Sequence, residues 1–132
     1  METKLIYLSD LEFNLRVWKR ELKFHKEELK KFEKQLEDVA SRNLGVEAMA
    51  PLEGFQNKII KEREVIDNIM QRIRIKKRLV KRADLHEELD GRLHKDQEPL
   101  RDEMKTYVKL HYELKEGLMD FLVRWIKLKK EL

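Results

Sequence analysis

The stretch 11–39, LEFNLRVWKRELKFHKEELKKFEKQLEDV, decides the fold. Its apolar side chains recur in alternating steps of four and three residues, and one polar residue interrupts the series: Leu11, Leu15, Trp18, Leu22, His25, Leu29, Phe32, Leu36 and Val39. A seven-residue repeat keeps one stripe of a helix facing its partners and winds the helices left-handedly around each other. The stretch therefore predicts a long helix packed lengthwise against other helices.

The ends of this first helix are predicted from local signals. Residues 9–12, SDLE, match a capping box, in which a serine hydroxyl and a glutamate carboxylate satisfy free backbone N–H groups. The seam also extends back to Leu8, so the helix is expected over about 3–43. Gly45 is then available for a left-handed residue after the helix end.

Two further helices are predicted on the same principle. The second spans about 51–94, with Pro51 in its first turn, although 84–87 (DLHE) is an alternative capping box that would break it. The third spans about 96–131, with Pro99 in its first turn. The predicted seams are Leu52, Phe55, Ile59, Glu62, Ile66, Ile69, Ile73, Lys76, Val80 and Ala83, and Leu100, Met104, Tyr107, His111, Leu114, Leu118, Phe121, Trp125, Leu128 and Leu132.

Length and composition agree with one all-α domain over 1–132. Charged residues make up 42% of the chain and only four Gly and two Pro interrupt it, which is typical of long solvated helices. Short connections force successive helices to lie antiparallel. The expected fold is an up-down-up, coiled-coil-like bundle of three long helices, without strands because alternating apolar and polar residues are absent.

Two helices carry more apolar residues than one seam requires. In the first helix these are Phe13, Val17 and Phe24, and in the third they include Tyr112, Met119 and Ile126. We interpret them as a self-association surface, most simply that of a twofold dimer. The alternative is a thick core with scattered surface apolar residues.

A basic run lies on the predicted second helix. Residues 72–82, RIRIKKRLVKR, hold seven basic residues, of which five share one outward sector: Arg74, Lys77, Arg78, Lys81 and Arg82. This sector is a candidate partner-binding face, and nucleic-acid phosphates would suit it. No outward aromatic residue accompanies it to stack on bases, so a solvated helix face is the favoured interpretation.

The histidines raise the question of a metal site. His25 and His111 occupy seam positions on helices expected to run parallel, and Glu62 of the second helix would complete a ligand set if the register brought the three together. His86, Asp90 and His94 form a second set spaced by four residues. Hydrogen-bonded seam residues and a solvated face are the favoured interpretations, so no metal and no cofactor are predicted.

No catalytic signature is present. The chain has no cysteine, its four glycines are isolated, and neither serine occupies a nucleophile motif. We therefore predict a protein that is not an enzyme. With no membrane-spanning run and no leader segment, a cytoplasmic protein without membrane contact is expected.

Several stretches resemble an uncharacterised family of small all-helical bacterial proteins. They are 36–43 (LEDVASRN), 55–67 (FQNKIIKEREVID), 100–104 (LRDEM) and 120–125 (DFLVRW). The resemblance implies an all-α fold and assigns no activity or functional residue.

The expected function is a non-enzymatic helical structural or protein-interaction module that self-associates and binds an unidentified protein partner. Two alternatives remain: an accessory nucleic-acid-binding protein that uses the basic sector, and a metal-binding helical bundle.

Overall fold

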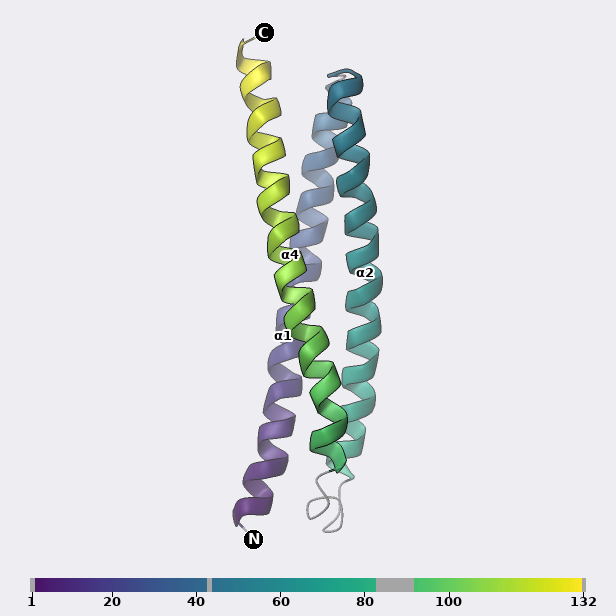
Figure 1. Ribbon diagram of the computed structural model, residues 1–132, viewed down its shortest axis with the longest axis vertical. Coiled ribbons are helices and arrows are strands. Elements are labelled where there is room, and N and C mark those ends of the chain that lie inside the picture. The colour runs from purple at the N-terminus through teal and green to yellow at the C-terminus, as the bar shows by residue number, and fades with distance from the viewer. Residues whose placement is uncertain (1, 43, 83–91, 132) are drawn as a thin grey trace.

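The computed structural model has three helices: α1, Glu2–Ser41; α2, Val46–Lys81; and α4, Arg92–Glu131. It describes residues 2–42, 44–82 and 92–131, and the side chains of 9–42, 44–82, 95 and 97–125. The helices lie side by side along one long axis, with α2 antiparallel to α1 and α4 (Figure 1). The predicted all-α bundle of three long antiparallel helices is confirmed. In the described residues, no helix is both long and apolar enough to cross a membrane.

The core lies along the predicted seams. Every described seam residue is buried except Trp18, Phe55 and Lys76, which are half-buried. The fully buried members include Leu22 and Leu29 of α1, Ile59 and Ile66 of α2, and Leu118 of α4. Apolar burial along these seams supplies the main stabilisation, at about 25 cal/mol per Å² of apolar surface removed from water.

The N-terminus of α1 differs from the capping-box prediction. The helix begins at Glu2, close to the predicted residue 3, so Ser9 and Glu12 lie inside it rather than at its start. Ser9 and Asp10 are exposed to solvent there. The capping pattern therefore marks no helix boundary.

The boundaries of α2 correct the predicted span of 51–94. The helix begins at Val46, with Gly45 as its N-cap at φ 93, so Gly45 serves the start of α2 rather than a cap on α1. Pro51 consequently lies inside the helix and not in its first turn. Ala48 is 1% exposed within the core, and its packing holds the turn that precedes the proline. The helix ends at Lys81.

The start of α4 also precedes its prediction. The helix begins at Arg92 rather than near residue 96, which places Pro99 inside it. Residues 92–94 therefore belong to α4, and the predicted continuation of α2 over 83–91 lies outside the described residues. Gln97, 3% exposed, donates from Nε2 to the backbone oxygen of Leu11 at 3.4 Å. This contact with α1 fixes the turn before Pro99.

Candidate functional site

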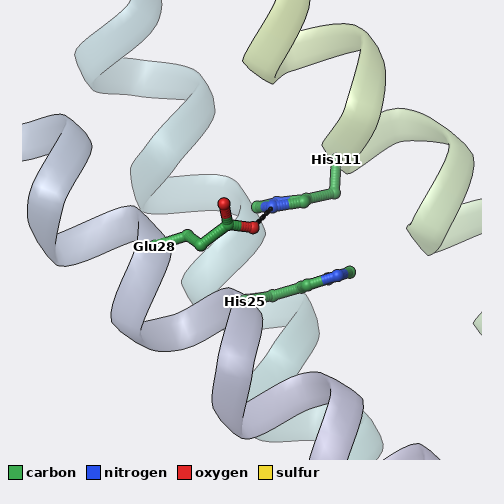
Figure 2. A group of neighbouring side chains, drawn as sticks. All are labelled: His25, Glu28 and His111. Atoms are coloured by element: carbon green, nitrogen blue, oxygen red, sulfur yellow. Dashed lines mark hydrogen bonds and ion pairs between the residues drawn. The ribbon is translucent and has the colours of Figure 1, made fainter.

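Three polar residues of the seams, His25, Glu62 and His111, meet in one layer of the core. His25 of α1 and His111 of α4 are both 0% exposed. Their rings stack with centroids 3.9 Å apart and planes 10° from parallel. Figure 2 shows the two rings reaching in from opposite helices and lying face to face, with Glu28 beside His111. The stack places His25 and His111 at the same level along the bundle.

His111 is held between carboxylates from two different helices. Its Nδ1 lies 2.9 Å from Glu62 Oε2 on α2, and its Nε2 lies 3.0 Å from Glu28 Oε1 on α1. A carboxylate only accepts hydrogen bonds, so both ring nitrogens donate and the ring is an imidazolium. Burial by itself lowers the pKa of His111, but the hydrogen bonds to Glu62 and Glu28 outweigh burial and raise it.

Glu28 connects His111 to a second cation. Its other oxygen, Oε2, accepts a hydrogen bond from Lys115 Nζ at 2.5 Å. The Glu28 side chain is only about one-tenth exposed, at 11%. Burial raises the pKa of this carboxyl, while the hydrogen bonds from Lys115 and His111 exceed that effect and leave the pKa below its ordinary value. Glu28 is therefore a stable carboxylate in the core.

His25 has a different electrostatic environment from its stacking partner. Its Nδ1 is 3.1 Å from the Tyr107 hydroxyl. Its Nε2 lies 2.9 Å from Glu21 Oε1 but is not aligned for a hydrogen bond, and this buried atom has no hydrogen-bond partner. Burial, followed by the charge on His111, lowers the pKa of His25, so the ring is neutral. Burial also raises the pKa of Tyr107, which stays protonated and can donate to Nδ1.

The structure therefore brings together His25, His111 and Glu62, the convergence that the seam pattern left as an alternative. Sequence reasoning missed Glu28 and Lys115. Their spacing held a signal, because Glu28 follows His25 by three residues and Lys115 follows His111 by four, which places each on the same helix face as its histidine. The second predicted set cannot be placed: His86 and Asp90 lie outside the described residues, as does the side chain of His94.

The predicted self-association residues lie on one side of the bundle. Lys26 pairs with Asp67 of α2, and Arg72 of α2 pairs with Glu103 of α4. At about 100° per residue, Phe24 lies on the side of α1 opposite Lys26, and Tyr112 lies on the side of α4 opposite Glu103. Both residues therefore lie toward the seam between α1 and α4. The groove along this seam is lined by Val17 and Val108, among other residues.

We call the exposed apolar residues along this seam the α1/α4 face. Each is at least two-fifths exposed: Phe13, Val17, Phe24, Tyr112, Met119 and Val123. Val123 was missed by sequence reasoning, although it follows Met119 by four residues on the same side of α4. Ile126, which was predicted to belong here, is on α4 beyond the described side chains.

The five basic residues of the predicted α2 sector are all exposed. The structure adds a contribution from α1, because a shallow groove between the two helices is lined by one acidic residue and five basic ones: Glu12, Arg16, Lys19, Arg20, Lys23 and Lys77. Sequence reasoning missed the α1 residues because they join the basic residues of α2 in one surface only when the two helices pack antiparallel. We call this surface the basic groove.

Comparisons of the chain with protein-family models, with curated proteins and with solved structures find no match. The resemblance to a family of small helical bacterial proteins therefore stays a prediction, and functional inference depends on the geometry of the described residues.

Proposed function

We propose that this chain is a self-associating helical module, whose α1/α4 face forms an antiparallel twofold dimer and leaves the other helix faces for protein partners. The observation that supports the proposal is a symmetry in the placement of the six exposed apolar residues of this face. The function is structural and requires no chemistry at the interface.

The symmetry follows from the level that the stacked histidines share. Phe13 lies twelve residues before His25, and Val123 lies twelve residues after His111. Val17 and Met119 are related in the same way by eight residues, and Phe24 and Tyr112 by one. Because α1 and α4 run in the same direction, the residues of each pair lie at equal distances on opposite sides of the histidine layer.

A twofold axis converts this placement into contacts. In a twofold interface, if residue i of one copy contacts residue j of the other, then j of the first also contacts i of the second. The apolar residues form a diagonal stripe that runs from the N-terminal half of α1 to the C-terminal half of α4. An axis in the interface plane, perpendicular to this stripe at the histidine layer, places Phe13 opposite Val123 and Val17 opposite Met119 of the second copy, while Phe24 and Tyr112 lie close to the axis. Six apolar side chains per chain then leave water together.

Disulfide trapping tests the arrangement, since the chain has no cysteine of its own. We expect Phe13→Cys and Val123→Cys chains, mixed in equal amounts under mild oxidation, to form a mixed disulfide dimer far faster than either variant forms one alone. The bond requires Cα atoms about 4.4–6.8 Å apart, which only the antiparallel pairing provides. Non-reducing electrophoresis and mass spectrometry measure the products.

Light scattering behind a sizing column provides the independent measurement. The unmodified chain should have twice its 16.1 kDa mass at tens of micromolar, and Phe24→Lys should return it to one chain with unchanged helical circular dichroism. Ile60→Cys, at an exposed position of α2 away from this face, is the matched control and should not cross-link quickly. A monomer at these concentrations contradicts self-association, while rapid Phe13–Phe13 and Val123–Val123 disulfides contradict the antiparallel arrangement.

The basic groove supports a second candidate function, binding of a polyanion such as duplex DNA. Basic side chains from two helices line one surface, which is the distribution that phosphate neutralisation requires. With about five phosphates neutralised, the logarithm of the affinity should fall with the logarithm of the salt concentration with a slope of about −4.5.

Fluorescence anisotropy of a labelled duplex, titrated at several salt concentrations, measures this slope. Neutralising two residues that line the groove in Lys19→Gln/Lys77→Gln should reduce its magnitude by about 2. Lys31→Gln/Lys34→Gln removes the same charge from exposed positions elsewhere on α1 and should leave the slope nearly unchanged. A salt-independent signal, or equal effects of the two double variants, contradicts binding through the groove.

A further inference from the structure

We propose that the buried histidine–glutamate layer is a binding site for one divalent first-row transition-metal ion of the Zn²⁺ class, with His25, Glu28 and His111 as its ligands. Each of the three residues offers one ligand atom, and these atoms all lie within 4.8 Å of one another. They come from α1 and α4, and all three side chains lie in the core. This inference is independent of the α1/α4 dimer.

The surrounding contacts resemble the outer partners of a metal site. In metalloproteins, a ligand histidine usually donates its other N–H to a carboxylate or another oxygen. In the metal-bound state, Nδ1 of His111 would donate to Glu62 and Nδ1 of His25 to the Tyr107 oxygen, which leaves Nε2 of both rings as the ligand atoms. Lys115 holds Glu28 through Oε2 and leaves Oε1 toward His111. Every candidate ligand is therefore oriented by a neighbour.

His25 supplies an observation that packing alone does not explain. Its ring is 0% exposed and Nε2 makes no hydrogen bond, although Glu21 Oε1 lies 2.9 Å away. Leaving a buried polar atom unsatisfied costs about 1–3 kcal/mol, and native structures contain few such atoms. A metal ion bound at Nε2 would satisfy this atom.

The charges of the layer also favour a divalent cation. Three carboxylates, Glu21, Glu28 and Glu62, face the Lys115 ammonium and a single imidazolium. Glu28 and Glu62 are only about one-tenth exposed, so their negative charge is poorly solvated and attracts a cation.

The ligand set selects the class of metal. Two imidazoles and one carboxylate are typical of zinc sites that keep a fourth position open, whereas Ca²⁺ and Mg²⁺ prefer oxygen ligands alone. A metal binds in the plane of an imidazole ring, so the parallel stack seen in Figure 2 must open. Metal binding and stacking are therefore mutually exclusive states of this layer.

Zn²⁺ and Co²⁺ are the probes for the experiment, which uses the full chain without a histidine tag. Isothermal titration after chelator treatment should give one Zn²⁺ per chain. Co²⁺ should produce the visible absorption bands of a nitrogen- and oxygen-ligated four- or five-coordinate ion. Replacing the outer carboxylate in Glu62→Gln should weaken the affinity about 10–100-fold.

Matched histidine variants locate the site. His25→Gln and His111→Gln should each abolish stoichiometric binding, while His86→Gln and His94→Gln, which also remove one histidine each, should retain it. Nitrogen-detected NMR of the unmodified chain keeps the test independent of variant folding, since Zn²⁺ should shift the Nε2 resonances of His25 and His111. No stoichiometric Zn²⁺ binding, or binding lost only with His86 or His94, overturns the proposal.

Discussion

Replacing His111 with alanine is expected to lower the free energy of unfolding by about 3–5 kcal/mol. The His111 ring lies 2.9 Å from Glu62 and 3.0 Å from Glu28 and donates to both. Its removal takes this shared donor away from two carboxylates whose side chains are only about one-tenth exposed. Guanidinium denaturation followed by circular dichroism measures the change. Chelator and a fixed protein concentration keep metal binding and self-association constant between variants.

A triple substitution separates the value of the whole network from the cost of breaking it. In Glu28→Leu/Glu62→Leu/His111→Leu no buried charge is left without a partner, and Lys115, one-third exposed, can return to water. Replacing a buried ionic cluster with apolar residues of similar volume is often neutral or stabilising, so this variant should be at least as stable as the original chain. If it were as unstable as His111→Ala, the network itself would be a net source of stability.

The second large effect is expected at Ile59, which is 0% exposed in the core of α2. Ile59→Ala should cost about 2–5 kcal/mol, because apolar contacts are lost and the rigid neighbouring helices close the cavity only in part. The same denaturation experiment measures it.

Ile60 offers a matched control one residue away. It is 53% exposed, so Ile60→Ala removes the same atoms from a solvated position and should change the free energy of unfolding by less than about 0.5 kcal/mol. Equal losses of unfolding free energy at the two positions would contradict the placement of Ile59 in the core and Ile60 in solvent.

The boundaries show where local sequence signals mislead. The two prolines each predicted a first helical turn, yet α2 and α4 begin earlier, and the SDLE pattern lies inside α1, whose start was predicted near residue 3 from the seam. Caps and prolines contribute about 1–3 kcal/mol locally. Tertiary contacts compete with them: Ala48 packs in the core before Pro51, and Gln97 reaches the Leu11 carbonyl before Pro99.

The histidine layer shows a similar limit for function. Seam positions identified His25, His111 and Glu62 as inward-facing, because the seven-residue period sets which side of each helix faces its partners. That Glu28 would accept from both His111 and Lys115, and that the two imidazoles would stack, depends on the axial offset between α1 and α4. No periodicity within one helix contains that offset.

The sequence by itself determined the all-α class, the three helices and the residues of their core, since each follows from spacing within a single helix. The tertiary structure decided which surfaces exist. Basic residues of α1 and α2 form one groove, and the exposed apolar residues of α1 and α4 form one symmetric face, only because the helices pack in this order and at this offset. The physical reason is that a surface shared by two helices depends on their relative placement, which is set by the complementarity of whole seams.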